Sequence, residues 1–303
     1  MAKIVGIGAC VFDTLYTVPT YPKEDTKLCA IASKTSGGGP AATGLVAASK
    51  LSESAAFIGV LSDDNGGKFL KEDFERYGVD TSLIEIRPGH RSFVSVLWLC
   101  QDSASRTCVF DKGDIPPLCL SAVQKKAVRD AEILMVDGNE LEAAVEAAKT
   151  AKESGTKVLY DCGGLYEGVE RLLALADIII PSEEFALGST GCSTADEAAQ
   201  TLFEMYRPEV VVVTQGKQGG RMYDGKTVTI YPAYPAVVVD SNGSGDVFHG
   251  AFAAAVAKGY DFLKCCHFSS AVSALKCMGV GARESVPDFE TTKNYLKENG
   301  YEL

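Results

Sequence analysis

Short apolar runs alternate with amphipathic stretches along most of the chain. Runs of strand length occur at residues 3–11, 55–60, 133–136, 157–161, 178–181, 209–214 and 237–239. Apolar positions repeat with a helical period at residues 41–51, 66–77, 141–154, 167–174, 247–258 and 262–278. Strands that alternate with helices are typical of a mostly parallel sheet with helices on both faces. The pattern therefore predicts an α/β fold, with one domain over residues 1–303.

Two segments follow a different pattern. Residues 15–33 and 93–110 alternate apolar and polar positions, as antiparallel strands with one solvated face do. They lie far apart in the sequence, but together they can form a small separate sheet of roughly residues 14–35 and 90–112. Such a sheet would act as a lid over one edge of the main domain or as a dimer surface. Two surface hairpins explain the periodicity equally well.

Composition limits the classes of function. The chain has 40 acidic and 29 basic residues and a formal charge of -11, the wrong balance for a protein that neutralises many nucleic-acid phosphates. No apolar stretch reaches the roughly 18 residues of a membrane span, and the N-terminus leads into a strand pattern without a signal-peptide apolar region. We therefore expect a cytoplasmic protein with neither a nucleic-acid nor a membrane partner.

The cysteines are numerous but show no binding pattern. Ten are present, without a Cys-x-x-Cys pair. Most lie in apolar runs, where cysteine behaves as a small hydrophobic residue. Buried free thiols are therefore expected, and disulfides are not.

The strongest chemical signal is the glycine-rich segment 240–248, which reads DSNGSGDVF. We expect a helix to begin there at about Ser244. The first amide groups of a helix lack internal partners and lie at the positive end of its dipole. Gly243 and Gly245 remove side chains that would block a phosphate, so the turn is a predicted anion hole. Asp246 is placed to take a proton from an attacking hydroxyl, although an acidic residue also favours a helix N-terminus on electrostatic grounds alone.

This segment resembles the C-terminal signature of the ribokinase-like (PfkB) carbohydrate kinases, Asp-Thr-x-Gly-Ala-Gly-Asp-x-Phe. Residues 36–41 (SGGGPA) resemble the family's diglycine motif at the sugar site. Residues 8–13 (GACVFD) end the first strand where the family places a sugar-binding aspartate. Residues 212–220 (VVTQGKQGG) resemble the Thr-x-Gly-x-x-Gly loop of the ATP site, and residues 281–287 (GARESVP) are also typical. The matches span nearly the whole chain.

The resemblance implies a three-layer ribokinase-like fold and transfer of the terminal phosphate of ATP to a hydroxyl of a small sugar or sugar derivative. It implies that Asp246 is the base and that Gly243, Ser244 and Gly245 stabilise the transferring phosphate. The implied sugar-binding residues are Asp13, Gly38, Gly39 and Thr43, and the nucleotide-binding residues are Thr214, Gly216 and Gly219. Magnesium is expected because ATP brings it. A monovalent cation such as K⁺ is implied at Asp240 and Asn242, with the 279–285 loop.

The chain departs from the family pattern in two motifs. Ala42 stands where the family has an Asn that contacts the sugar, which counts against a simple assignment of ribose. The family's magnesium motif, Asn-x-x-Glu, falls at residues 182–185, where Ser182 and Phe185 replace both defining residues. Glu184, or its neighbour Glu183, is then the candidate that organises Mg²⁺, unless both are a solvated helix start.

Two other functions stay open. A nucleoside kinase on the same scaffold would need a base-stacking pocket in the lid, for which Tyr16, Tyr21, Phe93 and Trp98 are candidates. A ligand-binding or regulatory homologue would have lost catalysis, but it would not need Asp246 beside an anion hole.

An anionic substrate requires that basic residues near the lid turn inward; these are Lys27, Arg91, Arg106 and Lys112. We expect His249 to pack within its helix and a homodimer, if there is one, to form through the lid.

Overall fold

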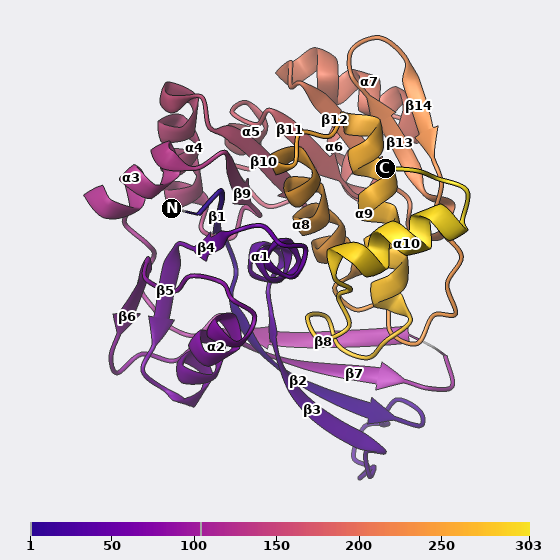
Figure 1. Ribbon diagram of the computed structural model, residues 1–303. Helices are drawn as coiled ribbons and strands as arrows, with labels where there is room; N and C mark the ends of the chain where they lie inside the picture. The colour runs from indigo at the N-terminus through magenta and orange to yellow at the C-terminus, as the bar shows by residue number, and fades with distance from the viewer. Residues whose placement is uncertain (1, 104) are drawn as a thin grey trace.

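The computed structural model describes residues 2–103 and 105–303 (Figure 1). Within these residues the main sheet has eight strands, in the order β14-β13-β12-β11-β10-β9-β1-β4. The strands from β12 to β4 are parallel to one another, and β13 and β14 add an antiparallel edge. Their bounds are β1 (Ile4–Ile7), β4 (Ala55–Phe57), β9 (Ile133–Val136), β10 (Lys157–Cys162), β11 (Ile178–Pro181), β12 (Val210–Thr214), β13 (Gly220–Tyr223) and β14 (Val228–Tyr231).

Helices cover both faces of this sheet (Figure 1). One face packs against α1 (Pro40–Lys50), α8 (Ser244–Ala257), α9 (Phe262–Cys277) and α10 (Phe289–Glu298). The other packs against α3 (Ala122–Asp130), α4 (Leu141–Ser154), α5 (Glu170–Leu173), α6 (Glu183–Thr190) and α7 (Ala195–Tyr206). Successive strand residues point to opposite faces, so Val212 joins the first core while Val211 and Val213 join the second. The predicted three-layer α/β fold is confirmed.

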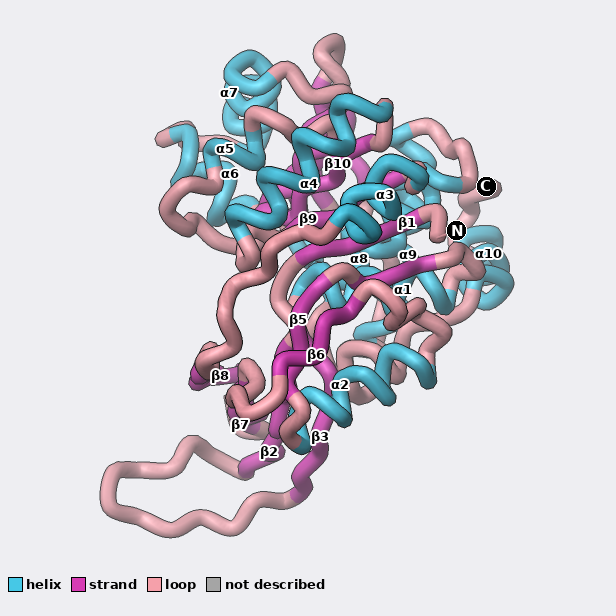
Figure 2. The backbone as a smooth tube through the Cα atoms, turned by 90° about the vertical axis from the view of Figure 1, so that its left-hand side faces the viewer, coloured by secondary structure: helices cyan, strands magenta, loops and turns pink. Residues whose placement is uncertain are grey.

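A second sheet, which we call the lid, has the strand order β3-β2-β7-β8. Its strands are β2 (Val11–Val18), β3 (Ala32–Gly38), β7 (Val94–Cys100) and β8 (Ser105–Asp111). The predicted pairing of the two distant segments is confirmed, although the central pair, β2 with β7, is parallel. The loop between β2 and β3 extends well beyond the body of the molecule (Figure 2). Helix α2 (Asn65–Arg76) and the parallel pair β5 (Gly59–Ser62) and β6 (Ile84–Arg87) adjoin the lid.

Two predicted strands are divided in the structure. The run at 3–11 ends in the main sheet at Ile7 and resumes in the lid at Val11, and the run at 55–60 is split between β4 and β5. Periodicity registers only the extended backbone, and the change of sheet at Gly8 or Ile58 does not interrupt the apolar pattern. The first run therefore passes from β1 directly into the lid strand β2, whereas the second passes from β4 into the two-stranded sheet of β5 and β6.

The strand expected at 237–239 is wrong. Its three valines are 82%, 62% and 59% exposed, and the segment is irregular. Only its end is held, where the Val239 amide donates to the Cys277 carbonyl at 2.8 Å. Three consecutive valines favour a strand locally, but no strand among the described residues pairs with this segment.

The other differences are smaller. The helix expected at 167–174 is reduced to α5. All ten cysteines are free, as expected, but only four of them are buried: three are half-buried, and Cys29, Cys108 and Cys119 are exposed, for which the expected burial is wrong. None of the helices in the described residues has the length and apolar character needed to cross a membrane.

Candidate active site

The predicted anion hole lies at the N-terminus of α8. Gly243 precedes the helix in a left-handed conformation, with φ 72°. A Cβ atom on Gly243 would lie 2.6 Å from the Cβ of Ala282, so both the backbone and the packing require glycine there. A Cβ on Gly245 would meet no atom within 4 Å, which means that this part of the turn faces open space. An open helix N-terminus suits a phosphate group.

Asp246 lies in the first turn of α8, directly beside these glycines. Burial raises the pKa of Asp246, and electrostatic interactions with His249, Arg106, Arg283 and Lys276 oppose that rise. A carboxylate is a stronger base when its pKa is raised towards neutrality. The arrangement therefore suits proton removal from a bound hydroxyl.

His249 is buried beneath Asp246, one turn further along α8. Its Nδ1 lies 2.6 Å from the Gly245 carbonyl oxygen, and its Nε2 lies 3.0 Å from the Ile180 carbonyl oxygen. Asp161 Oδ2 is 3.2 Å from Nδ1 and accepts no hydrogen bond from any described residue. Burial raises the pKa of Asp161 to about 7, although its electrostatic interaction with His249 lowers it. His249 packs within its helix as expected, and it also ties the anion hole to β11.

The predicted nucleotide residues line one cavity with the anion hole. This cavity of about 540 Å³ is bordered by Thr214, Gly216, Gly219, Ser244 and Gly245, among others. Both loop glycines have positive φ, 54° at Gly216 and 78° at Gly219. A Cβ on Gly219 would lie 2.1 Å from the Tyr231 carbonyl oxygen. The structure thus brings together the two segments predicted to bind ATP.

Asp13 and the diglycine segment meet on the other side of Asp246. Asp13 is buried on β2 and accepts a hydrogen bond from Ser95 Oγ at 2.6 Å. A Cβ on Gly38 would lie 2.0 Å from Asp13 Oδ2, and one on Gly39, where φ is 96°, would lie 2.0 Å from the Ala9 carbonyl oxygen. Burial raises the pKa of Asp13 to about 6, and the charge of Asp246 adds to the rise. Asp13 and Asp246 therefore face a common region between the lid and α8.

Arg283 holds the backbone of the diglycine segment in place. It is fully buried, and its guanidinium donates to Asp73 Oδ2 at 2.7 Å and to the Gly38 carbonyl at 2.8 Å. Thr43 is also fully buried, with its hydroxyl 3.4 Å from Arg283 Nε. Its side chain has no exposed surface, so the structure places Thr43 behind the cleft, next to Arg283. The expected sugar contact of Thr43 stays a prediction.

A family model described as pfkB family carbohydrate kinase matches residues 1–288. The chain belongs to this family. It is 27% identical over 298 residues to ribokinase from Haemophilus influenzae, covering 96% of this chain and 97% of that protein. It is 28% identical over 290 residues to 5-dehydro-2-deoxygluconokinase from Clostridium perfringens, covering 86% and 84%.

Solved structures agree. Arabidopsis thaliana ribokinase, solved with ribose and ATP, superposes with a TM-score of 0.88 at 26% identity and covers 98% of this chain and 99% of that chain. The resemblance seen in the sequence is therefore confirmed. This pfkB family member is an ATP-binding sugar kinase with the ribokinase-like fold.

The segment expected to organise magnesium is built differently from the family motif. Ser182 is the N-cap of α6 and accepts from the Phe185 amide at 3.1 Å. Glu183 Oε1 accepts from Gln215 Nε2 at 2.7 Å, while Glu184 is exposed at the helix surface. Glu184 therefore points away as a solvated first-turn residue, and Glu183 is the one held towards the nucleotide loop. Within residues 2–103 and 105–303, no group of three or more His, Cys, Asp or Glu side chains is arranged to hold a metal ion.

The residues of the expected monovalent-cation site are already engaged. Asp240 Oδ1 accepts from the Asn242 amide at 2.8 Å, and its Oδ2 accepts from the Gly281 amide at 2.9 Å. The Asp240 carbonyl oxygen accepts from Lys276 Nζ at 2.8 Å. Arg106 Nη1 donates to Asn242 Oδ1 at 3.1 Å. Two of these four oxygens, the Asp240 carbonyl oxygen and Asn242 Oδ1, already face a side-chain cation, so a K⁺ ion bound at them would be repelled by Lys276 and Arg106.

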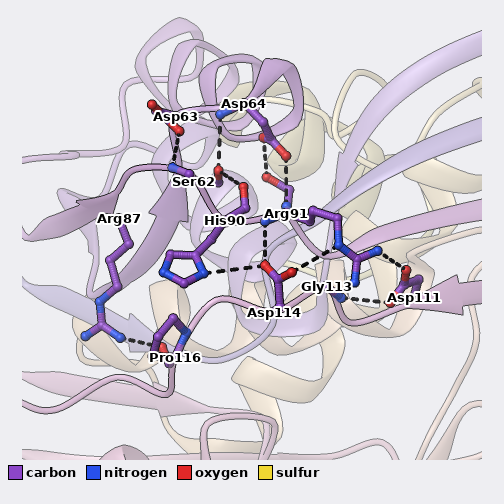
Figure 3. Close-up of polar contacts among 12 residues, drawn as sticks. Ser62, Asp63, Asp64, Arg87, His90, Arg91, Asp111, Gly113, Asp114 and Pro116 are labelled. Atoms are coloured by element: carbon purple, nitrogen blue, oxygen red, sulfur yellow. Dashed lines mark hydrogen bonds and ion pairs between the residues drawn. The ribbon is translucent and has the colours of Figure 1, made fainter.

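A polar network fastens the base of the lid to the main domain (Figure 3). Asp64, the N-cap of α2, accepts from the Ser92 amide at 2.9 Å and from its hydroxyl at 2.6 Å. Arg91 donates to Asp114 through its backbone at 2.7 Å and through Nε at 3.1 Å, and to Asp111 at 3.0 Å. Arg91, one of the basic residues expected near the lid, is thus paired with carboxylates.

Proposed function

We propose that this sugar kinase transfers the γ-phosphate of ATP to a hydroxyl of a small sugar or sugar derivative, with Asp246 as the general base. The observation that carries the proposal is the position of Asp246. Its neighbours Ser244 and Gly245 line a cavity of about 540 Å³ that contains both predicted nucleotide segments, and its charge acts on Asp13, which packs against Gly38. A base at this boundary touches the substrate hydroxyl and the phosphate at once.

The chemical step follows from this placement. Asp13 accepts hydrogen bonds from sugar hydroxyls and orients the ring. Asp246 takes the proton of the attacking hydroxyl, whose oxygen forms a bond to the γ-phosphorus while the bond from that phosphorus to the β,γ-bridging oxygen breaks and ADP leaves. The amides of Gly243, Ser244 and Gly245 stabilise the charge on the transferring group.

Magnesium enters with ATP. Mg²⁺ keeps several waters and binds through one or two carboxylates together with phosphates, and at this site it would neutralise phosphate charge. Glu183 is the candidate for this role, because Gln215 Nε2 holds its carboxylate towards the nucleotide loop. A donor set of this kind agrees with the lack of an all-protein metal cluster in the described residues.

The substrate is a sugar-like molecule that makes contacts different from those expected for ribose, because Ala42 is buried where the family pattern has Asn. A cavity of about 340 Å³ near the lid base is lined by Cys10, Phe93, Lys112 and Asn139, among others. Lys112 is the basic residue of the lid region placed at this cavity, so sugar acids and sugar phosphates belong among the substrates tested.

The outer face of the lid supports association with a second copy. The strand register places Tyr16, Val94, Val96 and Val109 on the face opposite Asp13, and all four are exposed. An apolar strip on a small sheet is a plausible dimer surface. We propose a homodimer through this face.

The experiment is ADP release with ATP and Mg²⁺ over sugars, sugar acids, sugar phosphates and nucleosides. Turnover with one class names the substrate. Asp246→Asn should lower kcat on the order of 10²- to 10⁴-fold while ATP still binds. Asp288→Asn is the matched control, since Asp288 caps α10 through the Thr291 amide, away from the cleft. Equal kcat for wild type and Asp246→Asn would overturn the role of Asp246, and ATP binding without turnover on any compound would favour a binding protein.

A further inference from the structure

Lys276 is a fully buried lysine beneath the anion hole. It lies in the last turn of α9, and its ammonium donates to the Asp240 carbonyl oxygen at 2.8 Å. Lysine is almost never fully buried unless it is paired, because removing its charge from water is costly. Burial accordingly lowers the pKa of Lys276, and the nearby carboxylates of Asp240 and Asp246 oppose that change. The buried charge of Lys276 at this position therefore indicates a specific role.

The segment that Lys276 contacts leads directly into the catalytic turn. The amides of Val239 and Asp240 both donate to the Cys277 carbonyl, at 2.8 and 3.1 Å. The carboxylate of Asp240 is held by the amides of Asn242 and Gly281. Lys276 adds the contact to the Asp240 carbonyl, so the residue that precedes the turn is held through its amide, carboxylate and carbonyl. The orientation of the next peptide units, up to Gly243 and Asp246, depends on this anchorage.

The same residue, Asp240, is where a cation would be expected from the family pattern. A metal ion bound to the Asp240 carbonyl oxygen would lie next to the ammonium of Lys276, and one bound to Asn242 Oδ1 would lie next to the guanidinium of Arg106. Like charges at such short range repel strongly in a buried setting. The charge that the turn requires is therefore already supplied by the chain itself.

We propose that the ammonium of Lys276 is a built-in cation that positions the Asp240 turn, so that phosphoryl transfer by this chain needs no monovalent metal ion. Lys276 is a positioning residue, since it acts through Asp240 and touches neither substrate. The inference rests on the proposed kinase function of the same site. Because the ammonium is tethered to α9, its occupancy does not depend on the salt around the protein.

The first test uses the wild-type enzyme in tetramethylammonium buffer, whose cation is too large to enter the turn. K⁺, Na⁺ or NH₄⁺ is then added at constant ionic strength. We expect kcat to stay within about twofold, a change smaller than that produced by slight misplacement of catalytic groups. Activation by K⁺ of about tenfold or more would overturn the proposal, and this result needs no variant to fold.

The second test removes the charge. Lys276→Met keeps a side chain of similar length without the charge. It should lower kcat by roughly 10- to 100-fold and change the KM for ATP less, because misplaced catalytic groups reduce the rate more than they reduce binding. Lys276→Ala leaves space, and added NH₄⁺ or K⁺ should restore part of its kcat. Lys258→Met is the matched control, since Lys258 pairs with Glu53 at 2.7 Å at the far end of α8. Unchanged kcat in Lys276→Met, or rescue by salt that is equal in Lys258→Met, would contradict the inference.

A third measurement does not depend on turnover. The melting temperature of Lys276→Ala should rise with NH₄⁺ or K⁺ above its value in tetramethylammonium, whereas that of wild type and Lys258→Met should not. If no substrate supports turnover, the proposed function fails while this thermal result still decides the role of Lys276. If turnover is found and K⁺ is required, the kinase assignment stands and the built-in cation does not.

Discussion

Arg283 and Asp73 form a buried ion pair that connects the C-terminal loop to α2, with Nη1 2.7 Å from Oδ2. The side chains are 1% and 5% exposed. The guanidinium also donates to the Gly38 carbonyl and lies 5.1 Å above the Phe74 ring. One arginine therefore holds together three segments around the sugar side of the cleft.

Arg283→Met should destabilise the protein by about 3–5 kcal/mol, because it leaves Asp73 as a buried charge without its partner. Urea unfolding measures the difference. Arg76→Met is the control: Arg76 contacts the other oxygen of Asp73 at 3.5 Å, but its side chain is 59% exposed. An exposed pair is worth about 0–1 kcal/mol. Similar losses in the two variants would show that the buried pair has no special role.

The two glycines of the anion hole should respond differently to alanine. Gly243→Ala forces a left-handed alanine, at a cost of about 1–2 kcal/mol, and adds a clash with Ala282. Gly245→Ala fits the free protein, since its Cβ meets no atom within 4 Å, but it should obstruct the phosphate. We expect Gly243→Ala to lose stability, and Gly245→Ala to keep its stability while kcat/KM for ATP falls by about tenfold or more. Thermal melts and steady-state kinetics separate the two, and an active Gly245→Ala would argue against phosphate binding at that amide.

The features predicted correctly from sequence are those in which local pattern and tertiary packing agree. The strands of the main sheet are apolar runs buried on both faces, so their period and composition identify them. The turn at Gly243 is predicted because a glycine, a helix start and Asp246 occur within a few residues. The strand predicted at 237–239 is wrong for the opposite reason: its valines favour an extended backbone, but no strand in the described part of the chain pairs with them.

The supporting contacts of the site could not be predicted in this way. Arg283 and Asp73 are 210 positions apart, and Lys276 and Asp240 are 36 apart. Arginine in the C-terminal motif and lysine in a helical stretch both look like ordinary surface charges in a sequence. Only their burial, which depends on how α9 and α2 dock, reveals their partners. The burial of Thr43 could not be predicted for the same reason, because its helix position does not indicate that it packs against Arg283.

Asp13 should make sugar binding depend on pH. Its pKa is raised to about 6, mainly by burial, while the Ser95 hydrogen bond and Arg283 lower it. Since the ionised form accepts sugar hydroxyls, the sugar KM should rise as pH falls below about 6. Asp13→Asn should bind more weakly and lose this dependence, and Ser95→Ala should move the midpoint to higher pH. A wild-type sugar KM that is constant between pH 5 and 7 would contradict the role of Asp13.

The same shift has a consequence for stability of the opposite sign. The folded pKa lies above the ordinary value of about 3.9, so the folded state binds more protons than the unfolded state in between. The stabilising contribution of Asp13 to the free energy of unfolding is therefore fully present below about pH 4 and is lost as pH rises through about 6. Between these pH values the free energy of unfolding should fall less in Asp13→Asn than in wild type. Urea unfolding at several pH values measures this difference. An identical pH slope in both proteins would mean that Asp13 ionises normally.

The lid should form a dimer through its outer face. Every residue of the edge strand β8 is exposed, and an unpaired edge beside apolar side chains favours association with another copy. Val109, 61% exposed on β8, lies in that face opposite Val96. Val109→Asp should convert a dimer to a monomer in size-exclusion chromatography with light scattering. Ile230→Asp is the control, because Ile230 is 65% exposed on β14, at the far edge of the main sheet. A wild-type monomer at all concentrations, or dissociation caused equally by both variants, would place the interface elsewhere or remove it.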